Sequence, residues 1–360
     1  MRLSSPRILI AGASVVALAA AGGVAVAATG DTPSKPAAKT GAAAQADPNA
    51  LVESFTPKTS DAAIKATTPA RVAASKPLKM PTINAAPASE AQASALSSGP
   101  VFEGAPTEPT VKDKASASAQ GMASTQAVVE ARVWTRHRSA PAKMIGKLLF
   151  DTPQGKNAHC SATVITAKNK RTVWTAGHCV NSGGKNGRRG RDYWNFRFIP
   201  DLPAKHTVWR IDRVVTLQGW TKHSNPAYDI AAVTTRGKIQ NYTGSQGYSF
   251  GYKKRAYRMW SFGYPANRIP GFKRYANNNL LRYCNGNTFG IRYRNASGVH
   301  LGMKCTMGQG ASGGPWIYAP NRKGYGRIAG INSMHANRTK DMYSPYHGSA
   351  AVAVYKAASK

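Results

Sequence analysis

The stretch Thr175-Ala176-Gly177-His178-Cys179 places an imidazole directly after an apolar run, Val173-Trp174, that we expect to form a β-strand. A strand that ends at a histidine, beside a cysteine able to form a disulfide, would hold the imidazole ring in a fixed position. Histidine has an ordinary pKa near neutral pH, so it can act as a general base. A single histidine is more often structural than catalytic, and its partners must be sought elsewhere in the chain.

A serine surrounded by glycines follows much later, in Gly310-Ala311-Ser312-Gly313-Gly314-Pro315. Glycines let the backbone turn tightly and bring N–H groups close to a substrate carbonyl oxygen. A weak hydroxyl nucleophile, a base near pH 7 and such donors are the parts that acyl transfer requires. The alternative is a plain glycine-rich turn.

Two other motifs overlap the serine and predict different chemistry. Residues 308–313 satisfy the dinucleotide-binding pattern G-x-G-x-x-G, and residues 310–314 satisfy the nucleophile-elbow pattern G-x-S-x-G, with Asp341 and His347 following. Both patterns require a helix after the motif. Here Pro315 and Trp316-Ile317-Tyr318 predict a strand, so we rank both alternatives below acyl transfer at Ser312.

A third group must orient the imidazole, and a carboxylate does this in hydrolases that use a serine nucleophile. The aspartates between His178 and Ser312 are Asp192, Asp201, Asp212 and Asp229. Asp229 begins an apolar strand in Tyr228-Asp229-Ile230-Ala231-Ala232-Val233, whereas Asp212 lies between arginines that explain it as a surface ion pair. We therefore predict that Asp229 is the third group.

These segments, with His159-Cys160-Ser161-Ala162, resemble the chymotrypsin-like (trypsin-like) serine peptidases over about residues 140–355. The resemblance implies an all-β fold of two six-stranded antiparallel β-barrels with the site in the cleft between them. It also implies that His178 is the base, that Asp229 orients it, and that Ser312 attacks the substrate carbonyl to form an acyl-enzyme. The backbone N–H groups of Gly310 and Ser312 would form the oxyanion hole, and no metal or cofactor is implied.

The sequence departs from the digestive members of that family, because Ala311 stands where they carry an aspartate. Residues 309–315 look closest to the secreted bacterial, glutamyl endopeptidase-like branch. Alignment to the nucleophile predicts a substrate pocket that includes Thr306, Met307, Asn332 and Ser333, and Ser333 resembles the serine that binds the triad carboxylate. A trypsin-type preference for Arg or Lys is not supported, because no aspartate stands just before Ser312 at the expected base of the pocket. A glutamyl preference is not supported either, because Asn332 falls where glutamyl endopeptidases use histidine. Nearby His335 is expected to be a surface residue.

The cysteines are Cys160, Cys179, Cys284 and Cys305. An even number in an exported chain predicts two disulfides, and the sequence alone allows three pairings. The resemblance implies that Cys160 is the partner of Cys179. No C-x-x-C spacing occurs, which argues against a zinc or redox motif.

Composition divides the chain into three parts. Residues 1–28, with a basic start, an apolar run and Ala25-Val26-Ala27, predict a cleaved signal peptide and hence a secreted, extracellular protein without stable membrane insertion. Residues 29–130 are rich in Ala, Ser, Thr and Pro, and we expect a disordered pro-segment or linker. Every Trp and Tyr lies in residues 131–360, the expected catalytic domain.

The catalytic domain shows many short β-type runs interrupted by Gly, Pro and Asn, which favours a barrel or sandwich. We predict strands at residues 147–150, 161–165, 171–175, 193–199, 208–217, 230–234, 257–263, 280–285, 301–306, 315–318 and 326–331, and a short C-terminal helix at 350–360.

The strong positive charge of the expected catalytic domain suggests an alternative function. From residue 131 onward, 38 Lys and Arg face 6 Asp, a balance of +32. Such a charge attracts polyanions, so the alternative to a peptidase acting on protein or peptide substrates is an inactive barrel that binds anionic cell-wall polymers or nucleic acid. We expect a monomer in either case.

Overall fold

The structure is a computed structural model, and it describes residues 50–89, 91–92, 100–111, 122, 126–294, 296–336 and 338–360. All of these belong to one compact unit, residues 46–360. The predicted signal peptide, residues 1–28, lies outside the described residues. No helix in the described part is long and apolar enough to cross a membrane.

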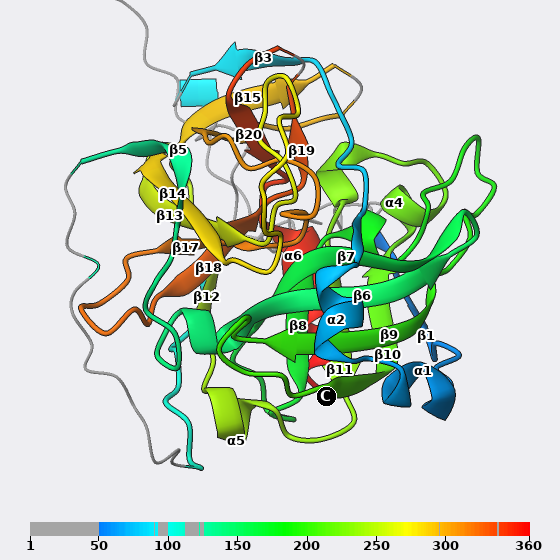
Figure 1. The fold of residues 1–360 in the computed structure, drawn as a ribbon. Helices are drawn as coiled ribbons and strands as arrows, with labels where there is room; N and C mark the ends of the chain where they lie inside the picture. The colour runs from blue at the N-terminus through cyan, green and yellow to red at the C-terminus, as the bar shows by residue number, and fades with distance from the viewer. Residues whose placement is uncertain are drawn as a thin grey trace, which may run out of the picture. The chain divides into compact units, whose positions relative to one another are not determined.

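The first half of the catalytic domain is a closed antiparallel barrel of six strands (Figure 1). Its strands are β6 (Ile145–Thr152), β7 (Gly155–Val164), β8 (Thr172–Thr175), β9 (Trp194–Pro200), β10 (Trp209–Leu217) and β11 (Ala231–Thr235). The ladder runs β10-β11-β8-β7-β6-β9, and Trp209 opposite Phe198 closes it between β10 and β9. The barrel surrounds an apolar core that includes Phe150, Trp174 and Phe196, so the first expected barrel is confirmed.

The strands of the second half form two sheets in which most neighbouring strands are antiparallel. They are β12 (Gly247–Phe250), β13 (Arg258–Gly263), β14 (Arg282–Asn287), β15 (Phe289–Tyr293), β16 (His300–Lys304), β17 (Pro315–Tyr318), β18 (Arg327–Ile331), β19 (Met334–His335) and β20 (Asp341–Ser344). One sheet contains β12-β18-β17-β13-β14, and the other contains β19-β20-β16-β15. Each predicted strand overlaps an observed one, whereas β12, β15, β19 and β20 were not predicted.

The second half therefore differs from one continuous six-stranded barrel. β14 packs against β16 and β18 packs against β20, but neither pair shares a ladder. The reason is that both edges of β14 are occupied, by β13 and β5 (Val128–Val133), and both edges of β18 are occupied, by β17 and β12. The disulfide between Cys284 and Cys305 links the two sheets.

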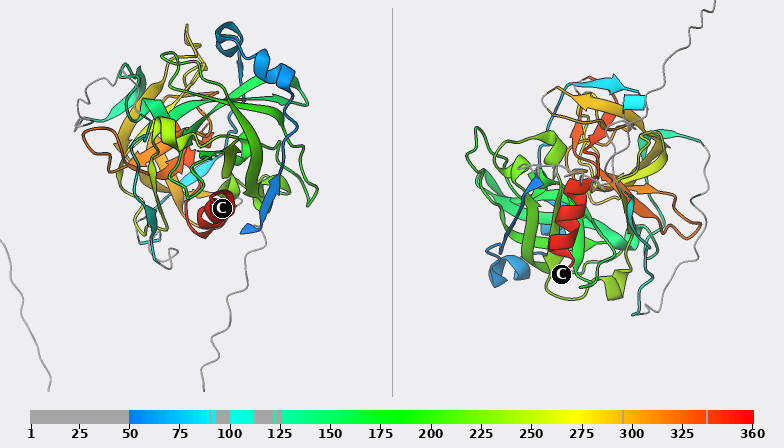
Figure 2. Two further views of the ribbon diagram at one scale, coloured as in Figure 1. Left: turned by 90° about the horizontal axis from the view of Figure 1, so that it is seen from below. Right: turned by 180° about the vertical axis from the view of Figure 1, so that it is seen from behind.

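The predicted C-terminal helix is α6 (Ser349–Ala358), which packs on the first barrel (Figure 2). Ala351, Val354 and Ala358 are fully buried against the barrel core. Two barrel side chains bind the C-terminal end of the helix, because Thr172 and Asn169 both donate a hydrogen bond to the Ala358 carbonyl. Shorter helical turns are η2 (Ala142–Met144), η3 (Gly177–Cys179), α4 (Gln218–Thr221), η4 (Pro226–Tyr228) and α5 (Gln240–Thr243).

The described parts of residues 29–130 are folded onto this domain, which corrects the expectation that the whole segment is disordered. They form β1 (Val52–Phe55), α1 (Asp61–Lys65), α2 (Pro69–Ala73), β2 (Lys76–Pro77), β3 (Ala85–Ala88), β4 (Phe102–Gly104) and the start of β5. β1 pairs with β10, β2 with β7, β3 with β15, β4 with β12 and β5 with β14. The segment has few large apolar side chains of its own, but it uses unpaired strand edges of the domain for its hydrogen bonds.

Candidate active site

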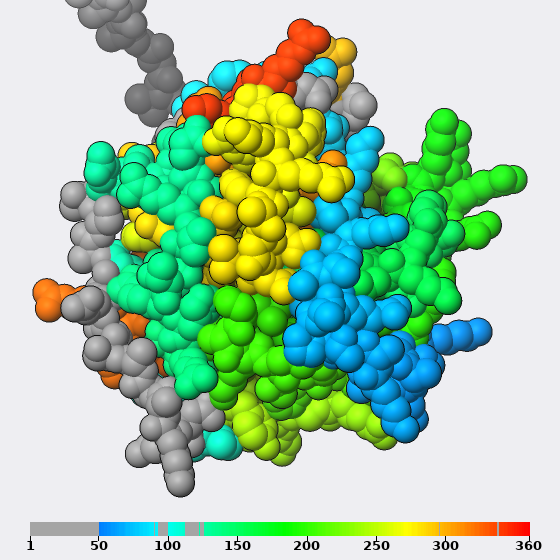
Figure 3. Space-filling model, in the orientation of Figure 1, coloured from blue at the N-terminus to red at the C-terminus, as the bar shows by residue number. Residues whose placement is uncertain are grey.

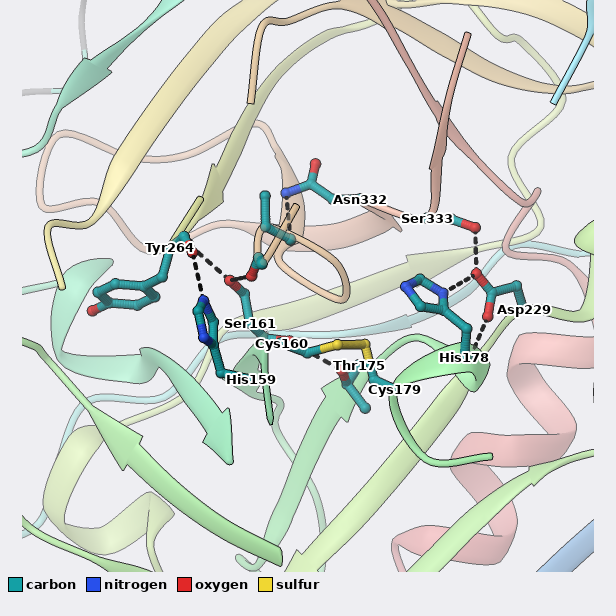
Figure 4. Close-up of a disulfide and its surroundings, with 12 residues drawn as sticks. His159, Cys160, Ser161, Thr175, His178, Cys179, Asp229, Tyr264, Asn332 and Ser333 are labelled. Carbon is teal, nitrogen blue, oxygen red and sulfur yellow. Dashed lines mark hydrogen bonds and ion pairs between the residues drawn. A yellow bond between two sulfur atoms is a disulfide. The ribbon is translucent and has the colours of Figure 1, made fainter. Parts of the chain in front are cut away.

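Adjacent strands bring His178 and Asp229 together. His178 lies in η3, directly after β8, and Asp229 lies just before β11, which pairs with β8 through Ala231 opposite Thr175. The Asp229 Oδ2 atom is 2.8 Å from His178 Nδ1, and Oδ1 accepts the His178 backbone N–H at 2.6 Å (Figure 4). The carboxylate therefore binds both the ring and the backbone of the same residue and fixes the orientation of the imidazole.

A third donor completes the surroundings of Asp229. Ser333, which belongs to the second half of the domain, donates a hydrogen bond from its hydroxyl to Asp229 Oδ2 at 2.5 Å. Asp229 is fully buried, and a buried carboxylate is retained where such donors satisfy it. Its field also reaches neighbouring phenols: burial, with the Asp229 charge in addition, raises the pKa of Tyr193 to about 12.

The loop that carries Ser312 packs against the end of β8. The Ser312 carbonyl accepts the Ser161 N–H at 2.7 Å, and the Gly313 N–H donates to the Asn332 carbonyl at 2.7 Å. Gly313 has φ +78°, and a Cβ atom there would lie 2.1 Å from the Thr175 hydroxyl oxygen. Only glycine allows this approach, which brings the serine loop to the strand that leads into His178.

The imidazole Nε2 atom of His178 and the hydroxyl Oγ atom of Ser312 are both buried. Neither has a hydrogen-bond partner among the described residues. Buried polar atoms are normally paired, and exceptions concentrate at functional sites. The ring nitrogen opposite the one held by Asp229 is thus free to exchange a proton.

The backbone beside Ser312 offers two further donors. Among the hydrogen bonds of the described residues, none uses the N–H of Gly310 or of Ser312. Gly310 has φ +89°, and a Cβ atom would lie 2.5 Å from His159 Nε2. The turn geometry that only glycine tolerates here leaves both N–H groups available to a developing negative charge.

The predicted pocket residues have different surroundings. The side chain of Asn332 donates to the carbonyls of Phe262 and Ala311, and its Oδ1 accepts from Ser261 and Trp316, so it supports the serine loop. The Thr306 hydroxyl accepts the Ala131 N–H of β5. Met307 belongs to a buried apolar cluster with Met303, Met342 and Ala311. Of the predicted set, Met307 is the residue whose side chain is buried in an apolar cluster.

Ser161 was not singled out by sequence reasoning, and it supports the site from β7. Its hydroxyl donates to the Gly310 carbonyl at 2.9 Å and accepts the Tyr264 N–H at 2.8 Å (Figure 4). The available signal was its position beside Cys160. His335, which we expected on the surface, is 2 % exposed, and its backbone is hydrogen-bonded to Pro81 and Ile83.

The structure contains two disulfides, Cys160–Cys179 and Cys284–Cys305, which is the sequential pairing. The first one joins β7 to the residue after His178 and so attaches the histidine to the barrel. Ligand-type atoms of Cys160, His178 and Cys179 lie within 4.8 Å of one another. This group is unsuited to a metal ion, because metal ligation by cysteine requires thiolates and both sulfur atoms are in a disulfide.

Comparison with known proteins gives a consistent family assignment. A family model described as Trypsin matches residues 138–357. The solved protease Anisep from Arthrobacter nicotinovorans is 31% identical, with 64% of this chain and 99% of that chain covered and a TM-score of 0.53. A thermostable serine protease, AL20, from an extremophilic microorganism is 30% identical, with 61% and 97% covered and a TM-score of 0.52.

A Glu endopeptidase solved in complex with MPD is 15% identical, with 64% of this chain and 97% of that chain covered and a TM-score of 0.49. This likeness is too distant to support an argument about specificity. None of the curated proteins matches the chain. Because the Trypsin model spans more than half of the sequence, the chain belongs to the trypsin family, and it is a serine endopeptidase.

Proposed function

We propose that this protein is an exported endopeptidase that hydrolyses peptide bonds with His178, Asp229 and Ser312 through an acyl-enzyme. The observation that supports it best is the buried, unpaired state of His178 Nε2 and Ser312 Oγ, while Asp229 holds the other ring nitrogen. A base of this kind contributes typically 10²–10⁴-fold to the rate.

The proposed steps follow from the contacts. The Ser312 hydroxyl attacks the substrate carbonyl carbon and its proton passes to His178 Nε2, while Asp229 stabilises the imidazolium through Nδ1–H. The N–H groups of Gly310 and Ser312 donate to the carbonyl oxygen as it becomes negative. The imidazolium then protonates the leaving amine, the peptide bond breaks, and water releases the acyl group by the same route in reverse.

We also propose that residues 1–28 are a signal peptide and that residues 29–130 are a pro-segment rather than a linker. The two disulfides suit an oxidising compartment outside the cytosol. The described parts of residues 29–130 pair with strands of both halves of the domain, which suits a pro-segment that folds on its own enzyme.

Labelling with a fluorophosphonate probe tests the proposed chemistry. We expect the protein recovered from the culture medium to be labelled at Ser312, and the Ser312→Ala variant to remain unlabelled. Equal absence of labelling in both proteins, with native circular dichroism spectra, would contradict the proposal and favour the anionic-polymer binder that the +32 charge suggests. Retention on heparin or on nucleic acid would then be the next measurement.

A further inference from the structure

The segment between α2 and β3 crosses the domain from the first barrel to the second half. In Figure 1 it runs as the light-blue chain from α2 up to β3, and Figure 3 shows it as a band beside the yellow atoms of the second half. At one end the Leu78 N–H donates to the His159 carbonyl at 2.9 Å. At the other end the backbone N–H of His335 donates to the Pro81 carbonyl at 3.2 Å, and the His335 carbonyl accepts the Ile83 N–H at 3.1 Å.

Both anchor points are close in sequence to residues that hydrogen-bond to the serine loop or to Asp229. His159 lies two residues before Ser161, which binds the carbonyls of Ser312 and Gly310. His335 lies two residues after Ser333, which binds Asp229. Residues 79–81 therefore connect the strand that supports the serine loop to the segment that follows Ser333. Ser312 and His178 are themselves buried, 0% and 4% exposed.

Met80 is the residue of this connection that points inward. Its side chain is 0% exposed, although Lys79 before it is exposed and Pro81 after it is half-buried. The Met80 thioether therefore lies inside the domain rather than on its surface.

The surroundings of Met80 are apolar and belong to the serine loop and the strands behind it. Met80 shares its buried cluster with Ala311, which precedes Ser312, and with Met307, Met303 and Met342. Leu301, Trp316 and Ala329 also belong to this cluster of buried apolar residues. Apolar walls disfavour a charged side chain that lacks a partner, and methionine walls adapt to flexible apolar side chains.

We propose that the apolar site occupied by the Met80 side chain is the pocket that selects substrates, and that the enzyme cleaves after unbranched or flexible apolar residues of the size of Met and Leu. This inference rests on the proposed function of Ser312. It assigns Met80 as a stand-in for the substrate side chain and Met307 as a wall that determines specificity.

The bound segment is not itself poised for cleavage. No described hydrogen bond uses the N–H of Gly310 or Ser312, so no carbonyl of residues 78–83 accepts from both oxyanion donors. In addition, the bridges to β7 and to His335 are parallel. The segment therefore places a side chain in the proposed pocket while none of its carbonyls accepts from the oxyanion donors, as an inhibitor would.

Two variants of the full chain test the assignment of Met80. Met80→Ala removes the side chain from the pocket, and truncating a buried Met costs enough stability to weaken docking by at least about 30-fold. We expect it to speed fluorophosphonate labelling of Ser312 by more than about tenfold relative to wild type. Lys79→Ala is the matched control, because its side chain is exposed, and it should label at the wild-type rate.

The substrate class is tested with the same Met80→Ala protein and a set of peptides that differ only at the residue before the cleaved bond. Met and Leu should exceed Ala, Glu and Lys in kcat/KM by on the order of 10²-fold. Met307→Glu should shift the preference towards Lys, which a merely structural role of Met307 would not produce. If Met80→Ala does not fold, Met80→Gln, with similar length and a polar end, provides the same two measurements.

The outcomes separate the two proposals. Labelling and cleavage with preference for Glu or Lys, or equal labelling rates of Met80→Ala and Lys79→Ala, would overturn the pocket assignment and leave the triad intact. Absence of Ser312 labelling in every folded variant would overturn the proposed function on which the assignment depends. Faster labelling of Met80→Ala with a Met or Leu preference would support both.

Discussion

The carboxylate of Asp229 accepts three hydrogen bonds in a fully buried position, and two of them come from His178. A surface aspartate such as Asp212 instead pairs with Arg171 and remains 38% exposed. The difference matters because an exposed ion pair contributes about 0–1 kcal/mol, whereas a buried acceptor determines the tautomer and the position of its partner.

The first prediction concerns this residue. Asp229→Asn should lower kcat by about 10⁴-fold, because an amide at this position favours the tautomer of His178 that cannot accept the proton of Ser312. The measurement is kcat for a Met-containing peptide, with circular dichroism to verify folding. Asp212→Asn is the control and should retain wild-type kcat; a loss of similar size in both variants would contradict the role of Asp229.

At the scale of elements, strand edges explain why a segment of low hydrophobicity folds. β1, β3, β4 and β5 each extend a sheet of the domain, and β2 pairs in parallel with β7. Their burial is modest, but the paired backbone groups do not need apolar side chains. The same occupation of edges divides the second half into two sheets, since β5 takes the edge of β14 that faces away from β13.

We expect the packing of helix α6 on the first barrel to contribute measurably to stability. Val354 is fully buried against the core of the first barrel, so Val354→Ala should lower the free energy of unfolding by roughly 2 kcal/mol through lost apolar burial and a residual cavity. Thermal or urea unfolding of the full chain measures it. Lys356→Ala on the exposed face is the control, and an equal effect of the two substitutions would show that α6 does not pack as described.

For the whole molecule, charge explains part of the attachment of the N-terminal segment. Its acidic residues pair with basic residues of the domain, as Glu53 does with Arg189, Glu108 with Lys323, and Glu130 with Lys340. Each pair is exposed or half-exposed and individually weak. Together they place the few carboxylates of residues 50–130 against a domain of charge +32, which guides the segment to the enzyme that carries it.

Two buried histidines contribute to the response of the whole molecule to acid. Burial lowers the pKa of His300 and of His347 from the ordinary 6.5 to about 4. The unfolded chain therefore binds more protons between these values, so stability should fall as pH decreases from 6.5 to 4. Each group can contribute up to roughly 3 kcal/mol to this loss.

His347→Gln tests that dependence. His347 Nε2 accepts from Trp174 at 3.1 Å and Nδ1 lies 3.0 Å from the Pro345 carbonyl, contacts that a glutamine amide can also make without titrating. The variant should lose less stability than wild type between pH 6.5 and 4, as measured by Tm at each pH. Parallel Tm curves for the two proteins would exclude His347 as a contributor.

The fold family, the first barrel and the C-terminal helix could all be predicted from the amino-acid sequence, and so could the candidate triad. This was possible because these features depend on short motifs around His178, Asp229 and Ser312 and on local strand patterns that need no knowledge of distant partners. Tertiary structure alone decided how the second half divides into sheets, how Asn332 supports the serine loop, and where Met80 lies. These depend on which strand edges remain unpaired once the domain has folded. The shared burial of residues more than 200 positions apart, such as Met80 and Met307 in one cluster, leaves no local pattern in the chain.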